Sequence, residues 1–147
     1  MVIPMLRFLK LCSLLVLLAC LPACQTQPTD DALYHELGGM EGITRITDNF
    51  IYEIGFDKNI VRHFEETDLD RFREKFIEQV CELSGGPCRY SGDSMVDVHS
   101  NMNITEAEFN QTVDLLIAAM NRSGIAHPTQ NKLLALLAPT RPDIIYQ

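Results

Sequence analysis

The histidines are the side chains best suited to bind a metal ion or to exchange protons near neutral pH. Three of the four, His35, His63 and His127, lie in charged or loop-like surroundings, so we expect them at the surface. His99 differs because it ends the short, mostly apolar segment 95–99. A single histidine beside apolar residues fits two interpretations, a packed core side chain or a ligand, and its composition alone favours the first.

Other catalytic patterns are missing from the sequence. It contains no GxSxG, HExxH, EF-hand or Walker motif. The carboxylate pairs Glu65-Glu66 and Asp68/Asp70 stand at predicted loop and helix-cap positions, without a partner that suggests acid–base catalysis. The sequence therefore does not predict conventional nucleophile–base chemistry.

Two cysteines of the main body, Cys81 and Cys88, are separated by six residues that include Gly-Gly-Pro. This spacing is not CxxC, and no CxxCH occurs, so neither a zinc site nor covalently attached haem is predicted from them. Disulfides persist in exported proteins, and we therefore predict a local Cys81–Cys88 bridge. The alternative is a pair of free thiols.

The first 23 residues differ in kind from the rest. Arg7 and Lys10 are their only charges, and the apolar run 11–21 is too short to span a bilayer comfortably. A basic start, a short apolar core and small residues before a cleavage site are typical of a secretory signal peptide.

The signal peptide is predicted to be of the lipoprotein type. The sequence Leu-Pro-Ala-Cys ending at Cys24 resembles a bacterial lipobox, in which the cysteine is lipidated and becomes the new N-terminus. Cys20 ends a competing match, and a plain signal peptide is the remaining alternative. We predict cleavage before Cys24, a polar tether over 24–31, and a membrane-anchored protein exported to the periplasmic side.

The charge balance narrows the possible partners. The chain has 12 Lys and Arg against 20 Asp and Glu, a net charge of −8, which becomes −10 once the leader is removed. Binding to nucleic acid or to an anionic membrane surface needs clustered cations, so neither is predicted.

From residue 32 onward the apolar residues recur with helical spacing, and no segment alternates with period two. Asp68 is predicted to cap one helix, and Thr105 with Glu108 forms a capping box for another that Gly124 ends. Gly55 and Pro139 are expected to end helices. The sequence thus predicts one all-α domain over 32–147, with helices or turns at 33–37, 40–54, 59–64, 69–83, 96–99, 106–123 and 129–137.

The pattern as a whole resembles the truncated haemoglobins of group I. The motifs that carry the resemblance extend over 32–138: Tyr34 with Leu37-Gly38-Gly39, Gly85-Gly86, the run Tyr90-x-Gly92-x-x-Met95-x-x-x-His99, then Asn103-Ile104-Thr105 and Phe109. The resemblance implies a two-over-two helical sandwich around haem b. It also implies that His99 is the proximal iron ligand, with its other ring nitrogen donating to the Met95 carbonyl.

The resemblance implies further haem contacts. Phe64 is expected to pack on the haem, and Lys75 to reach a propionate, although an exposed helix cation is an equal alternative and Arg71 or Arg73 could take the role. An apolar lining is expected from these residues: Phe64, Phe72, Phe76, Val80, Met95, Val98, Phe109 and Leu116.

One position departs from the family pattern. Group I members usually have a tyrosine on the second helix that donates a hydrogen bond to bound oxygen, but counting without gaps places Ile51 there and Tyr52 one residue later. One residue is about 100° of helix rotation, so either Tyr52 lies outside the ligand pocket or a helix irregularity restores it. Phe72 and Phe76 offer no polar substitute, and weak oxygen retention is expected.

Three functions remain open at this stage. The first is a haem globin that reversibly binds diatomic ligands (O2, NO and CO). The second is an enzyme that converts nitric oxide and oxygen to nitrate, for which an exported protein would lack cytoplasmic reductants. The third is a haem-free helical lipoprotein. The sequence does not identify a redox partner.

Overall fold

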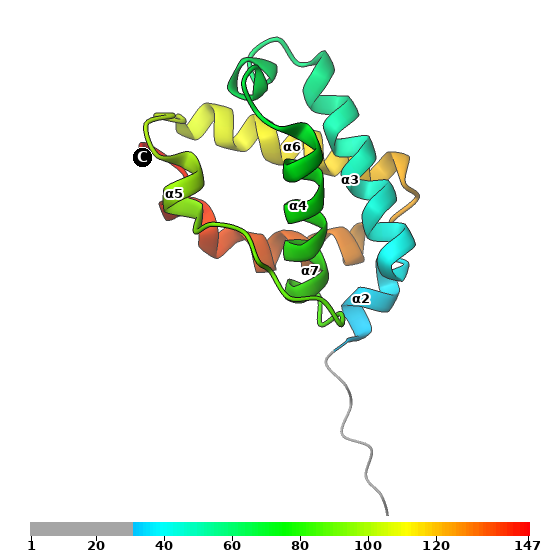
Figure 1. The fold of residues 1–147 in the computed structure, drawn as a ribbon. Helices are drawn as coiled ribbons and strands as arrows, with labels where there is room; N and C mark the ends of the chain where they lie inside the picture. Colours follow the sequence, from blue (N-terminus) through cyan, green and yellow to red (C-terminus); the bar gives the residue numbers. More distant parts are fainter. Residues whose placement is uncertain (1–30) are drawn as a thin grey trace, which may run out of the picture.

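The computed structural model describes residues 31–147 (Figure 1). The predicted signal peptide, Cys24 and the tether up to residue 30 lie outside the described residues. Within the described part, no helix is both long and apolar enough to cross a bilayer.

Helices make up most of the described chain. They are α2 (Ala32–Glu36), α3 (Gly39–Phe56), the 3-10 helix η1 (Val61–Phe64), α4 (Leu69–Leu83), α5 (Met95–His99), α6 (Glu106–Arg122), α7 (His127–Leu137) and the 3-10 helix η2 (Ala138–Asp143). In Figure 1, α3 and α4 form one layer and α6 and α7 lie behind them, while α5 stands apart beside η2 at the C-terminal end. The predicted all-α fold class is confirmed.

Two helices, α4 and α6, begin at the capping residues that the sequence predicts. The Asp68 carboxylate accepts a hydrogen bond from the backbone N–H of Arg71 at 3.0 Å, which satisfies one of the free donors of α4. At the start of α6, Thr105 and Glu108 form the complete capping box. Gly124 follows α6 with a φ of +77°, the left-handed conformation that commonly ends a helix.

The prediction that Gly55 ends the second helix is wrong. The helix continues through Gly55 to Phe56. It ends where the Asp57 side chain accepts hydrogen bonds from the backbone N–H groups of Asn59 and Ile60, at 2.9 and 3.0 Å. A glycine inside a helix costs only about 1 kcal/mol, which tertiary packing easily offsets.

The last helix ends at Leu137, as predicted, but its start differs from the prediction. It begins at His127, because Pro128 fits the first helical turn, where its missing N–H has no intrahelical partner. Pro139 does not stop the helical path, which continues as the 3-10 helix η2. The C-terminal residues then return to the segment just before α6, where Ile104 and Ile145 form an isolated parallel bridge.

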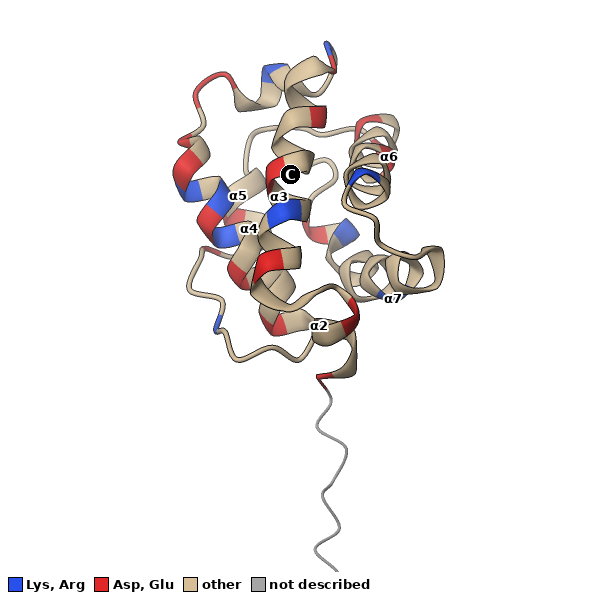
Figure 2. Ribbon diagram, turned by 90° about the vertical axis from the view of Figure 1, so that its right-hand side faces the viewer, with Lys and Arg blue, Asp and Glu red and all other residues tan. Residues whose placement is uncertain are grey.

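The apolar core lies between the two layers. Apolar residues of α3 that recur with helical spacing are buried there, since Ile43, Ile46, Phe50 and Ile54 are at most 4% exposed. Other fully buried side chains come from α4, α6, α7 and the turn before α3: Leu37, Val80, Cys81, Ala119, Met120 and Leu133. Charged residues of both signs are interspersed along the outer surface of α4 (Figure 2).

Candidate functional site

His99 stands at the last position of α5 in the orientation expected of a ligand. Its Nδ1–H donates to the Met95 carbonyl at 2.8 Å, and within residues 31–147 nothing is hydrogen-bonded to its Nε2. Burial lowers the pKa of the His99 imidazole below its ordinary value, and the hydrogen bond to Met95 opposes this shift. A neutral ring with Nδ1 occupied by a carbonyl leaves the Nε2 lone pair for iron, which is the ligand state of a metal-bound histidine.

Three phenylalanines lie close together, Phe64 at the end of η1 and Phe72 and Phe76 on α4. The ring centroids of Phe64 and Phe72 are 5.1 Å apart, those of Phe72 and Phe76 are 5.8 Å apart, and Phe76 lies 5.2 Å from Phe50. The structure thus brings the predicted Phe64, Phe72 and Phe76 together across η1 and α4. All three are only partly buried against the core.

The phenylalanine-bearing face of α4 is turned toward α5. Phe72, Phe76 and Gln79 follow one another at helical spacing, and the Gln79 amide contacts the Met95 sulfur at 3.6 Å. This contact places α4, which carries two of the phenylalanines, beside α5, which carries His99.

Val98, beside His99 on α5, is 48% exposed. Within the part of the chain that the structure describes, this is apolar surface that a flat apolar group could cover. Together with the free Nε2 of His99, this surface makes the residues present fit a haem.

Lys75, which is expected to reach a haem propionate, contacts neighbouring side chains in the structure. Its ammonium donates to Glu74 at 2.8 Å, to Glu78 at 3.1 Å and to the Ser91 hydroxyl at 2.8 Å. Hydrogen bonds from Lys75 to these carboxylates raise its pKa, the contact with Glu74 most strongly. A propionate would have to replace an existing ion pair.

The two arginines offered as substitutes for Lys75 are also paired with carboxylates. Arg71 donates to Asp93 at 2.8 Å, and Arg73 donates to Asp48 at 2.5 Å. Their cations therefore anchor the loop before α5 and the middle of α3, respectively.

Cys81 and Cys88 form a disulfide in the structure, with an S–S distance of 2.03 Å. It ties the buried end of α4 to the segment that leads toward α5. Gly86 lies under this bridge, where an added β-carbon would be 2.5 Å from the Tyr34 ring and 2.7 Å from the Cys81 sulfur. Only glycine fits this close approach.

Two carboxylates of α4 complete the attachment of that segment. Glu78 accepts hydrogen bonds from the backbone N–H and the hydroxyl of Ser91, at 3.0 and 2.9 Å. Glu82 accepts from the backbone N–H of Tyr90 at 3.0 Å. Neither contact is predicted by the sequence, although Glu78 and Glu82 are four residues apart and therefore lie on one face of α4.

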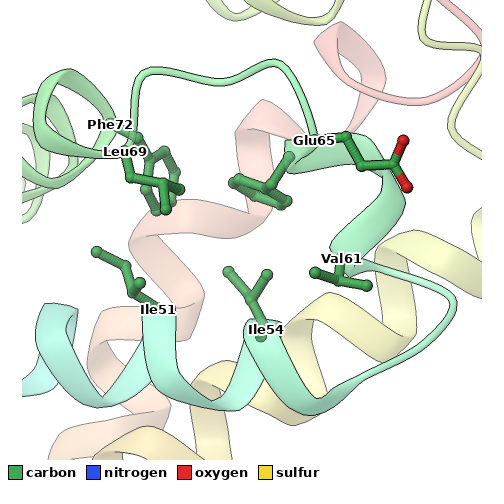
Figure 3. A pocket seen from close by; sticks show the side chains of 8 residues that line it. Ile51, Ile54, Val61, Glu65, Leu69 and Phe72 are labelled. Carbon is green, nitrogen blue, oxygen red and sulfur yellow. The ribbon is translucent and has the colours of Figure 1, made fainter.

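Ile51 and Tyr52 take different sides of α3. Ile51 lines an apolar pocket of about 120 Å³ between α3, η1 and α4 (Figure 3). Tyr52 is 48% exposed, with its ring 4.7 Å from the Phe56 ring and 4.7 Å from the Arg122 guanidinium carbon. Of the two alternatives for Tyr52, the structure therefore has the outward one. Because α3 is a continuous helix here, one residue of rotation turns Tyr52 outward.

The expectation that His63 is a surface histidine is also wrong. Its side chain is only 16% exposed, and its Nε2 lies 3.1 Å from the Glu108 carboxylate. Glu108 also bonds Arg62 and accepts from the backbone N–H and hydroxyl of Thr105, at 2.9 and 2.7 Å. These hydrogen bonds hold the pKa of Glu108 far below its usual range, those from Thr105 most strongly. His35 and His127 are exposed, as predicted.

The Glu108 network positions an expected haem contact. It fastens η1, which carries Phe64, to the first turn of α6. The capping box predicts the contact of Glu108 with Thr105. Nothing in the sequence predicts its contacts with His63 and Arg62, which are 45 and 46 residues away.

Comparisons with known proteins agree with this geometry. Residues 32–146 match the family described as bacterial-like globin. The group 1 truncated hemoglobin GlbN of Mycolicibacterium paratuberculosis is 28% identical over 113 residues, which cover 77% of this chain and 83% of that protein. The group 1 truncated hemoglobin of Tetrahymena pyriformis is 25% identical over 113 residues, 77% of this chain and 93% of its own.

Solved structures share the fold. The Fe(III) form of truncated hemoglobin from Tetrahymena pyriformis aligns with a TM-score of 0.75 at 24% identity, over 78% of this chain and 98% of that one. The 2/2 hemoglobin from Synechococcus aligns with a TM-score of 0.71 at 20% identity, over 77% and 97%. The fold is thus the two-over-two helical sandwich of truncated globins, and the family match spans nearly all described residues. This chain belongs to the bacterial-like globin family.

Proposed function

We propose that this globin holds haem b through His99 and binds diatomic gases, O2, NO and CO, on the side of α3 and α4. The observation that carries the proposal is the hydrogen bond from the Nδ1–H of His99 to the Met95 carbonyl. This bond holds the ring against α5 and leaves its Nε2 available to bind iron. When bound, the haem iron supplies the coordination position at which a gas molecule is held.

The chain's own residues would supply the rest of the site. Phe64, Phe72 and Phe76 offer an aromatic surface for one face of the macrocycle, while Met95 and Val98 offer apolar contacts beside His99. Burying such surfaces is the main source of affinity for a large apolar cofactor.

The gas-binding side is proposed to lack a hydrogen-bond donor from α3. Ile51 stands where its side chain reaches the pocket, and Tyr52 is turned outward. O2 acquires partial negative charge when it binds, so it gains more from a donor than CO does, and a hydrogen bond to a charged acceptor contributes about 1.5–3 kcal/mol. We therefore expect CO and NO to be retained more firmly than O2.

Export and lipid anchoring are a separate proposal. It rests on the basic start, the apolar run and the lipobox-like sequence that ends at Cys24. Mass spectrometry of the protein recovered from membranes should find an acylated Cys24 at the N-terminus. A Cys24→Ser variant should lose the acyl group and leave the membrane fraction, and an unchanged distribution would contradict the proposal.

Haem titration tests the main proposal. Adding haem to the purified haem-free protein should produce a Soret band that saturates at one equivalent. A protein that gives no such band would support the haem-free alternative instead. Mixing the oxygenated protein with nitric oxide tests the enzymatic alternative, which requires rapid formation of nitrate.

A further inference from the structure

The short helix α5, which carries His99, is held to the rest of the fold mainly from one side. None of its five side chains is buried, and among the described helices it packs chiefly on η2. Toward α4, the Gln79 amide contacts the Met95 sulfur at 3.6 Å, and a thioether sulfur is only a weak acceptor. Figure 1 shows α5 apart from the two helix layers and next to the segment that follows α7.

We infer that residues 141–147 are a positioning element for His99, which hold α5 in the place where the histidine can ligate iron. The inference rests on the proposed function, because it takes His99 to be the haem ligand. It adds that the quality of this ligation is set by a part of the chain more than 40 residues away from the histidine.

Two backbone hydrogen bonds join this segment to the turn that follows α5. The N–H of Asn103 donates to the carbonyl of Gln147, and the N–H of Tyr146 donates to the carbonyl of Ile104, both at 3.0 Å. The segment is thus attached to the chain four residues after His99, by bonds that do not depend on the identity of the side chains.

The turn between these bonds and His99 is short and constrained. The N–H of Met102 donates to the His99 carbonyl at 3.1 Å. Asn101 and Asn103 both have the left-handed backbone conformation, with φ of +66° and +47°. Residues other than glycine keep this conformation only where their surroundings impose it. A shift at Asn103 is therefore passed on to His99, because no flexible linker lies between them.

Side chains fasten the segment in turn. The Arg141 guanidinium pairs with the Glu106 carboxylate at 3.2 Å and lies over the Phe109 ring, 5.7 Å from its centroid. The Gln147 amide donates to the Pro142 carbonyl at 2.8 Å. Arg141 thereby anchors the segment to the start of α6, and Gln147 closes the segment on itself.

The segment takes no part in the main apolar core. The buried members of that core and the partly buried side chains packed on them extend along the described chain only as far as Leu137. Ile145 is half-buried, and Tyr146 is 60% exposed. Deleting residues 144–147 should therefore leave the core intact and act on the position of α5.

The test compares the haem-loaded wild type with a variant that lacks residues 144–147. Resonance Raman spectroscopy of the ferrous protein measures the stretching band between iron and the histidine nitrogen, and transfer of haem to apomyoglobin measures haem loss. The variant should show a shifted or broadened band and should lose haem about tenfold faster or more, because both backbone hydrogen bonds are removed.

Tyr146→Phe is the matched control, because it alters an exposed ring and keeps both backbone hydrogen bonds. Its haem loss should stay within about twofold of the wild type. Arg141→Gln is the second variant if the deletion does not fold, and it should accelerate haem loss about threefold. The conservative Arg141→Lys, which can still pair with Glu106, should restore most of the wild-type rate.

Hydrogen exchange of the haem-free proteins provides a readout that is independent of iron. The Asn103 amide should be protected in the wild type and in Tyr146→Phe but exchange freely in the deletion variant, while the amides of α3 stay protected in all three. Equal protection of Asn103, or an unchanged Raman band and haem-loss rate in the deletion variant, would overturn the inference. A wild type without an iron–histidine band would instead overturn the ligation by His99, and the inference with it.

Discussion

Ile51 and Tyr52 are consecutive residues of α3, yet only Ile51 lines the apolar pocket while the Tyr52 ring packs on Phe56 at the surface. This relationship separates the present chain from the tyrosine-bearing pattern it resembles. Since α3 is continuous, the difference is one of register along a regular helix.

Restoring a donor at position 51 should strengthen oxygen binding. We expect Ile51→Tyr to slow O2 dissociation about tenfold or more, because a hydrogen bond of 1.5–3 kcal/mol is gained, and the adjoining pocket offers room for the larger ring. Displacement of O2 by CO in a stopped-flow instrument measures this rate. Tyr52→Phe is the control and should leave the rate unchanged; faster dissociation in that variant would place Tyr52 inside the site.

Glu108 should contribute stability that depends on pH. Its carboxylate accepts hydrogen bonds from Thr105, Arg62 and His63, and its folded-state pKa lies below the unfolded value. The stabilisation is therefore present above about pH 4.5, the range of an unfolded glutamate, and is lost as the pH falls. Glu108→Gln should lower the free energy of unfolding by about 1–3 kcal/mol at pH 7 and by less at pH 3.

Urea unfolding at the two pH values measures this difference. Glu106→Gln is a suitable control, since that side chain is 58% exposed and pairs with Arg141 at the surface. Its effect at pH 7 should be small, at most about 1 kcal/mol. Equal destabilisation by Glu108→Gln at both pH values would contradict the ionic role of Glu108.

The disulfide should stabilise the segment between α4 and α5. Cys88→Ser should lower the free energy of unfolding by about 2–3 kcal/mol, the range for closing a loop this short. Urea unfolding with and without a reductant provides the measurement. The wild type should respond to the reductant and Cys88→Ser should not; an equal response of both proteins would show that the reductant acts elsewhere.

Much of the fold could be predicted because its signals are local. The Asp68 cap, the capping box at Thr105 and the stripe on α3 each depend on residues a few positions apart. The hydrogen bond from His99 to Met95 also follows from a spacing of four residues in a helix.

The features that the sequence did not reveal depend on distant parts of the chain. The burial of His63 requires Glu108 on another helix, and the pairing of Lys75 involves Ser91 in a loop. The path of α3 through Gly55 is set by packing and by the Asp57 turn beyond it. Helical periodicity carries no information on such contacts.

The most direct test of the central claim is the haem spectrum of His99→Gly, with His127→Gly as the control at an exposed histidine. His99→Gly should lose the wild-type Soret spectrum, and added imidazole should restore it by replacing the missing ring. His127→Gly should match the wild type without imidazole. A His99→Gly protein with an unchanged spectrum in the absence of imidazole would contradict the assignment of His99 as the iron ligand.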